Sequence, residues 1–209
     1  MPSPRPEHVS PPERRRRAAF SIIELLISCA IMLILYAMMF GFGAKQNQMR
    51  QKTKCRASLQ KIYVGLQIYA NDNRSQFPSA TNAATSEDAL DELIPRYTAD
   101  NSIFICPGSK DSRLTPGDPL KRERISYAYY MGLQEANATH ALLSDRQVDS
   151  TAKTNGQQIF STDGKRPANN HYKYGGSILF CDGSMKASPA LLEFALPIAT
   201  NVTLLNPKP

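Results

Sequence analysis

The stretch from Leu25 to Ala44 constrains this chain more than any other feature, because it contains no charged side chain. As an α-helix it would be about 30 Å long, which matches the hydrocarbon thickness of a bilayer. An amphipathic helix on the core of a soluble domain would keep a polar face, whereas this one is apolar all round. The sequence therefore predicts one membrane-spanning helix.

The residues before this span predict its orientation. Four consecutive arginines, Arg14–Arg17, favour a cytoplasmic N-terminus. The C-terminal part would then be periplasmic or extracellular, and the chain a single-pass protein of the inner membrane. A cleaved secretory signal would have a shorter apolar region with small residues on its far side, but Ala18 and Ala19 lie on the near side.

The net charge of +7 does not indicate a nucleic-acid-binding surface. Residues 1–19 carry +3 of it, and the remaining +4 is spread over a chain in which acidic and basic residues are interspersed. Nucleic-acid-binding domains instead gather their basic residues on one face. We therefore expect no nucleic-acid partner.

Glu24 is the one charged residue at the head of the apolar run. A carboxylate at a membrane boundary is costly unless it has a partner, so Glu24 is a candidate functional residue. The alternative is that Glu24 merely lies at the level of the lipid headgroups.

These residues resemble the N-terminal segment of type IV prepilins and pseudopilins, which have a basic leader, a small residue, a Phe and then a Glu at mature position five. Here Arg14–Arg17, Ala19, Phe20 and Glu24 take those places, although the family prefers Gly where this chain has Ala19. The resemblance implies cleavage between Ala19 and Phe20 by a prepilin peptidase and N-methylation of Phe20. It also implies that Glu24 neutralises the α-amino group of a neighbouring subunit, since buried charges are tolerated only in pairs.

The pattern after the span predicts that the helix continues. Apolar residues recur at helical spacing, and the helix is expected to run from Phe20 to about Asn71. The residues of this apolar face are Cys55, Leu59, Ile62, Leu66 and Tyr69. The predicted organisation is a basic leader at 1–19, a transmembrane and assembly helix at 20–44, an amphipathic continuation at 45–73, and a globular head at 74–209.

The head shows short apolar runs that predict an antiparallel sheet, which makes the expected fold α+β: a long N-terminal helix on a small sheet, as in pilins. The expected strands cover Ile103–Ile105, Ile125–Met131, Ala141–Ser144, Ser177–Cys181 and Ser184–Lys186. Asp182-Gly183 predicts a hairpin with a type I′ turn. Thr85 is expected to cap a short helix that Pro95 ends, and residues 146–170 are expected to form a surface loop.

Three of the four cysteines would face an oxidising compartment, while Cys29 lies in the span. Cys55 and Cys106 are the preferred disulfide pair and would leave Cys181 unpaired, although the sequence does not determine the choice. No close Cys/His spacing of the zinc type is present, so no metal site is expected.

A second resemblance is to bacterial prepilin-like proteins with a C-terminal His separated by nine residues from Asp-Gly. Cys55, Tyr69–Asn73 and Cys106-Pro107 look like further landmarks of that group, and His171 and Asp182-Gly183 take the places of its C-terminal motif. Ten residues, not nine, separate His171 from Asp182. This motif implies no biochemical function.

The sequence thus favours a subunit of a type IV pilus-like or type II secretion-type filament, with other pilin-like subunits and an inner-membrane assembly platform as partners. No enzyme activity, catalytic residue or cofactor is expected: a hydrolase built on His171, Cys181 and Asp145 has no supporting motif, and a turn at Asp182 offers too few oxygens for Ca²⁺. The alternative is an uncleaved membrane anchor whose outer domain binds a ligand, for instance around Tyr127, Tyr129 and Tyr130.

Overall fold

The computed structural model describes residues 21–41, 43–112, 114–148, 158–188 and 199–209. The chain divides into two compact units, residues 1–43 and residues 44–209, and the second is called the head unit below. The head unit includes both the predicted amphipathic helix at 45–73 and the predicted head at 74–209.

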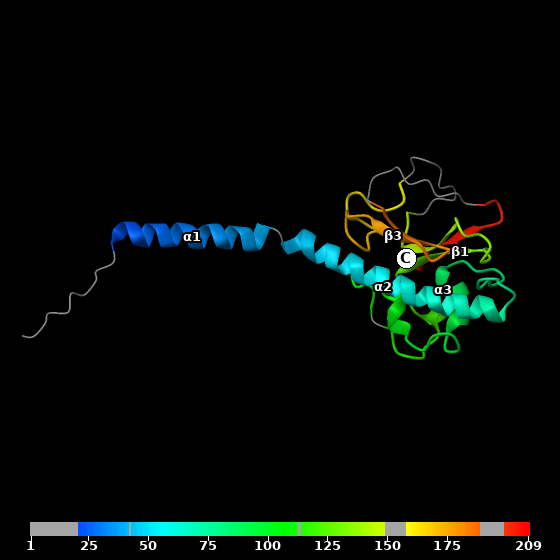
Figure 1. Ribbon diagram of the computed structural model, residues 1–209. Helices are drawn as coiled ribbons and strands as arrows, with labels where there is room; N and C mark the ends of the chain where they lie inside the picture. Colours follow the sequence, from blue (N-terminus) through cyan, green and yellow to red (C-terminus); the bar gives the residue numbers. More distant parts are fainter. Residues whose placement is uncertain (1–20, 42, 113, 149–157, 189–198) are drawn as a thin grey trace, which may run out of the picture. The chain divides into compact units, whose positions relative to one another are not determined.

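The first unit contains helix α1, Ile22–Gly41 (Figure 1). Its described side chains, residues 22–39, are all exposed within this unit. Aliphatic residues and methionines dominate its sequence, and such residues have good helix propensity. The long expected helix corresponds to α1 together with α2 of the head unit, whereas Phe20 and Phe42 lie outside the described residues.

Helix α2, Gly43–Asp72, lies in the head unit from Ala44 onward and ends where the Asn-Asp-Asn run predicted. The predicted apolar face is confirmed for Cys55, Leu59, Ile62 and Leu66, which are fully buried, whereas Tyr69 is only partly buried. Helix α3, Ser86–Leu90, follows Thr85 as its N-cap and continues into the 3-10 turn η1, Asp91–Leu93. The backbone N–H of Thr85 donates to the Asp88 carboxylate at 3.0 Å, which satisfies a group that the helix leaves free.

Five antiparallel strands form one sheet in the order β4-β3-β2-β1-β5. The strands are β1 Tyr127–Met131, β2 Ala141–Asp145, β3 Gly176–Phe180, β4 Met185–Ser188 and β5 Thr203–Leu205. The α+β layout with an apolar N-terminal helix is therefore confirmed. Every residue of β2 and β3 is buried, so both faces of the central sheet are covered.

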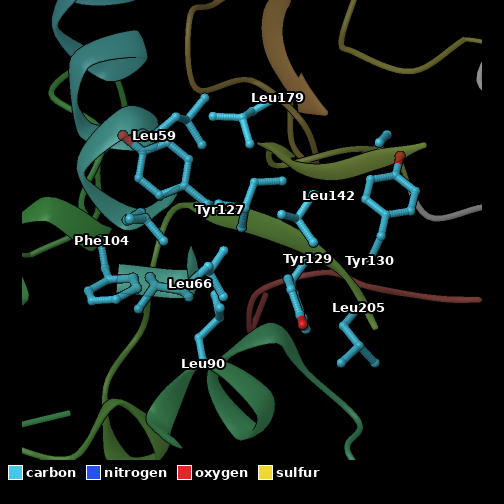
Figure 2. Close-up of a cluster of buried hydrophobic side chains, with 14 of the residues drawn as sticks. Leu59, Leu66, Leu90, Phe104, Tyr127, Tyr129, Tyr130, Leu142, Leu179 and Leu205 are labelled. Atoms are coloured by element: carbon cyan, nitrogen blue, oxygen red, sulfur yellow. The ribbon is translucent and has the colours of Figure 1, made fainter. Parts of the chain in front are cut away.

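The hydrophobic core lies between α2, α3 and the sheet. Figure 2 shows Leu59 and Leu66 of α2, Leu90 of α3 and Tyr127 and Tyr129 of β1 in one buried cluster. The tyrosines of β1 suit a strand at the centre of this core, because aromatic residues carry large apolar surfaces and are common in strands.

Two expectations for the head, a strand at 103–105 and a surface loop at 146–170, were wrong. Ile103 and Phe104 belong to the 3-10 turn η2, Asn101–Phe104, because the side chain of Asp100 accepts from the N–H of Ser102 and closes a turn. The expected surface loop at 146–170 is not a surface loop, since Ile159 and Phe160 are buried; residues 149–157 of that loop lie outside the described residues. The C-terminal segment, where no strand was expected, supplies β5.

The hairpin at Asp182-Gly183 is present, but its turn is not the expected type I′. Gly183 alone has a positive φ there, +79°. Its N–H donates to the Phe180 carbonyl at 3.0 Å, and Phe180 N–H donates to the Ser184 carbonyl at 2.9 Å. This pattern is that of a three-residue loop in which a glycine in the left-handed region follows a type I turn.

Candidate functional site

The N-terminal segment presents an apolar surface that nothing in its own unit covers. Residues 22–39 form a helix long and apolar enough to cross a membrane, and none of this window is buried. The core helix of a soluble protein would be mostly buried, so this helix has the character of a membrane anchor.

Glu24 lies in the first turn of α1, exposed at the N-terminal end of that apolar surface. The N-terminal end of a helix carries a partial positive charge, which suits a carboxylate there. Ala19 and Phe20, the predicted cleavage site, and Phe20 as the predicted methylation site lie outside the described residues. Their roles and the pairing role of Glu24 therefore stay predictions.

A second group of predicted residues comes together inside the head unit. A disulfide joins Cys55 of α2 to Cys106, which follows η2, and this is the pairing preferred from the sequence. Both residues are buried, at 0% and 1% exposed. The bond ties the long helix to a segment 51 residues further along the chain.

His171 lies against this disulfide. Its Nε2 is 3.5 Å from Sγ of Cys106 and 3.4 Å from Oδ2 of Asp145, and the side chains of His171 and Asp145 are 0% and 1% exposed. Asp145 ends β2, and its carboxylate also accepts from the Ser177 N–H at 2.8 Å and from the Asn170 amide at 3.1 Å. Within the described residues, Nδ1 of His171 has no hydrogen-bond partner. The structure thus places two of the predicted landmarks, Cys106 and His171, in contact.

This arrangement does not have the geometry of a thiol-hydrolase triad. In such a triad one ring nitrogen faces the nucleophile and the other faces the carboxylate. Here Cys106 and Asp145 both approach Nε2 of His171, and Cys106 is engaged in a disulfide. Cys181, the sulfur considered for catalysis, is not a member of this cluster.

Lys52 is a buried cation that sequence reasoning missed. Its ammonium donates to the backbone carbonyls of Tyr174 at 3.0 Å and Ser188 at 3.1 Å. Burial lowers the pKa of Lys52, and the negative charge of Asp145 partly offsets that shift. Lys52 stands in a helix rich in exposed basic residues, so no signal in its surroundings marked it as different.

The C-terminal motif separates in space. Asp182 is exposed in the hairpin turn, and its carboxylate accepts from the Ser184 N–H at 2.8 Å. The neighbouring Cys181 is a buried free thiol whose pKa burial raises to about 12, so it stays protonated at neutral pH. Asp182 and Gly183 thus shape a turn, whereas His171 belongs to the buried cluster.

The three tyrosines named for a ligand-binding surface are core residues. Tyr127, Tyr129 and Tyr130 are at most 1% exposed, and Figure 2 shows them among the leucines of the core. The hydroxyl of Tyr129 donates to the Pro78 carbonyl at 2.7 Å, which satisfies it internally. These side chains are therefore not free to contact a ligand.

Comparison with known proteins identifies the N-terminal segment. Residues 14–40 match the family described as the prokaryotic N-terminal methylation motif. The match covers the arginine run, Ala19, Phe20, Glu24 and most of α1. No curated protein matches the chain, and no solved structure does. At its N-terminus this chain therefore carries the methylation motif of type IV prepilins and pseudopilins, ahead of a pilin-like α+β layout.

Proposed function

We propose that the chain is a subunit of a type IV pilus-like or type II secretion-type filament, inserted into the membrane as a prepilin and processed between Ala19 and Phe20. The observation that carries this proposal is the methylation motif at residues 14–40 on a helix whose apolar surface is wholly uncovered.

The uncovered helix explains why assembly follows from insertion. Apolar surface gains roughly 25 cal/mol per Å² when it leaves water, so residues 22–39 require either lipid or other helices around them. A bilayer supplies the first environment. A bundle of identical helices in a filament supplies the second and buries the same surface.

In this proposal Glu24 determines how neighbouring subunits align with one another. Cleavage after Ala19 would create a positively charged α-amino group at Phe20, just ahead of α1. Between packed apolar helices, an unpaired carboxylate or ammonium is strongly unfavourable, whereas a pair is tolerated. Pairing Glu24 of one subunit with the amino group of its neighbour would therefore fix the axial register of the filament.

The remaining parts of the proposal concern location and partners. The arginine run would stay cytoplasmic, the head unit would be periplasmic or extracellular, and the partners would be a prepilin peptidase, an assembly platform and other pilin-like subunits. In this function the chain acts structurally and not as an enzyme.

The test is the intact mass and N-terminal sequence of the membrane-extracted protein, expressed with and without a prepilin peptidase. We expect a peptidase-dependent chain that begins at Phe20 and carries one additional methyl group. Ala19→Gly serves as the matched control, because it restores the residue that the family prefers and should be processed at least as fast. Retention of Arg14–Arg17 by both proteins in the presence of the peptidase would contradict the proposal and favour a permanent anchor.

The role of Glu24 is tested separately. Glu24→Gln keeps the size of the side chain and removes its charge, so the variant should insert and be processed normally but fail to enter filaments. Filament yield, measured by shearing and immunoblotting, reports assembly separately from processing. Normal assembly of Glu24→Gln would refute the pairing role while leaving the processing result untouched.

A further inference from the structure

Four side chains that bind metals meet at one buried point of the head unit. Cys55 comes from α2, Cys106 from the segment after η2, Asp145 from the end of β2, and His171 from the turn before β3. All four are buried, and their ligand atoms lie within 4.8 Å of one another. No two of them are close in the sequence, so the folded chain alone brings them together.

The chemistry of this donor set is that of a zinc site. Structural zinc is bound tetrahedrally by thiolate, imidazole and carboxylate ligands, at about 2.3 Å for sulfur and about 2.0–2.2 Å for nitrogen and oxygen. Tetrahedral angles then place a sulfur and a nitrogen about 3.6 Å apart, and a nitrogen and an oxygen about 3.4 Å apart. The observed separations are 3.5 Å for Cys106 and His171, and 3.4 Å for His171 and Asp145. Two edges of the tetrahedron are thus present before any metal enters.

The charges in the cluster favour a cation when the disulfide is open. Asp145 contributes a buried carboxyl group, with Lys52 as a buried positive neighbour. Reduced and deprotonated, Cys55 and Cys106 would add two negative charges in a place that water does not reach. Buried charges of one sign are strongly unfavourable without compensation, and a divalent ion supplies it.

The ring of His171 can present Nε2 to a metal. In the disulfide form Nε2 lies 3.4 Å from Oδ2 of Asp145, and Nδ1 has no partner within the described residues. A neutral imidazole that coordinates a metal through Nε2 carries its hydrogen on Nδ1. Gly108 leaves room on this side, since a Cβ at that position would lie 2.6 Å from Nδ1 and 2.4 Å from the Asn170 carbonyl oxygen.

We propose that Cys55, Cys106, Asp145 and His171 form a redox-dependent zinc site: the dithiol form binds one Zn²⁺, and the disulfide form releases it. This inference does not depend on processing at Ala19 or on assembly into a filament.

The exchange between the two forms balances with a disulfide-class oxidant. The two zinc-bound thiolates give up two electrons and form the S–S bond between Cys55 and Cys106. The S–S bond of the oxidant takes these electrons with two protons and becomes two thiols, and Zn²⁺ leaves. In the reverse direction a dithiol reduces the protein disulfide and Zn²⁺ replaces the two thiol protons. The two forms exclude each other, because only deprotonated thiols act as ligands.

The test uses the full chain in detergent, in a background of Cys29→Ala and Cys181→Ala so that only the cluster supplies sulfur. The protein is reduced with a phosphine, the phosphine is removed, and Co²⁺ is titrated as a spectroscopic substitute for Zn²⁺. We expect one Co²⁺ per chain with a thiolate-to-cobalt charge-transfer band and tetrahedral ligand-field bands, displaced by Zn²⁺. The oxidised chain should bind no Co²⁺ and show none of these bands.

His171→Gln should weaken metal binding by more than about tenfold, since loss of even a second-shell partner has an effect of that size. His140→Gln is the matched control, because His140 is not a member of the cluster, and it should bind normally. A reduced chain that stays folded by circular dichroism yet binds no Co²⁺ would overturn the proposal, as would equal binding by His171→Gln. If the reduced chain unfolds, added Zn²⁺ should refold it, and a chain that stays unfolded with Zn²⁺ would also overturn the proposal.

Discussion

Removing the Cys55–Cys106 disulfide should lower the free energy of unfolding of the head unit by about 4 kcal/mol. The bond closes a loop of 51 residues, and in the chain-entropy model a cross-link of that span removes about 4 kcal/mol of freedom from the unfolded chain at 25 °C. The change to make is Cys55→Ala with Cys106→Ala, which removes both sulfurs of the pair, so that neither position can bind metal or form a new disulfide.

The assay is urea unfolding of the full chain in detergent with a chelator present. The chain has no Trp, so the signal is tyrosine fluorescence, which the buried Tyr127, Tyr129 and Tyr130 make sensitive to the core. The slope of the free energy against urea should also rise, because an unfolded chain without the cross-link exposes more surface.

Cys181→Ala is the matched control for this measurement. It removes a buried sulfur without opening any cross-link and should lower the free energy of unfolding by only about 1 kcal/mol, the scale of one small buried group. A double variant that is no less stable than Cys181→Ala would refute the reasoning, since the disulfide would then contribute nothing beyond the packing of its sulfurs.

Three further predictions concern single positions of the head unit. Lys52→Met should lower the free energy of unfolding by about 1–3 kcal/mol in chemical denaturation, because the hydrogen bonds from the buried ammonium to the carbonyls of Tyr174 and Ser188 are lost; an unchanged midpoint would contradict this role. Gly183→Ala should cost about 1–2 kcal/mol in the same assay, because φ is +79° there and the new Cβ would lie 2.9 Å from the ring of Tyr63. Hydrogen bonds from Ser184 lower the pKa of Asp182, so the turn is stabilised above the unfolded pKa of about 3.9 and loses that contribution as the pH falls through the lower folded value. The protection factor of the Ser184 amide, which compares its exchange rate with that of an unstructured amide at the same pH, should therefore fall in acid in the wild type but show no such step in Asp182→Asn.

The parts of the fold that the sequence predicted are those with a strong local pattern. The charge-free run gives α1, and the spacing of Cys55, Leu59, Ile62 and Leu66 gives the buried face of α2. The run of tyrosines gives β1. In each case the residues within one element determine its type, so no knowledge of distant neighbours was needed.

The errors have two causes, one local and one distant. Ile103 and Phe104 look like strand residues, but the N–H of Ser102 donates to the nearby Asp100 side chain and closes a turn there. Ile159 and Phe160 lie in a polar stretch whose composition predicts a surface loop, yet their side chains are buried in the core. Only the tertiary structure determines that burial, because the surrounding residues carry no periodic pattern.

The two candidate sites differ in how far the sequence alone could indicate them. The methylation motif is contiguous, so the sequence alone indicated it. The buried cluster was missed as a unit because the usual zinc signature is a pair of ligands two to four residues apart. Cys55, Cys106, Asp145 and His171 are instead contributed singly by four segments. Asp145 and His171 were considered together only with Cys181, as a hydrolase, and not with Cys55 and Cys106.

The position of β5 has a consequence for the order of folding. Thr203–Leu205 pairs with Tyr129–Met131 and completes the edge of the sheet. Until synthesis has passed Leu205, the outer edge of β1 presents unpaired backbone groups beside an aromatic surface, and such edges pair readily with other chains. The head unit therefore cannot fold progressively from its N-terminal side, because its first strand depends on one of its last segments. Truncation before Thr203 should make the head unit associate through that edge.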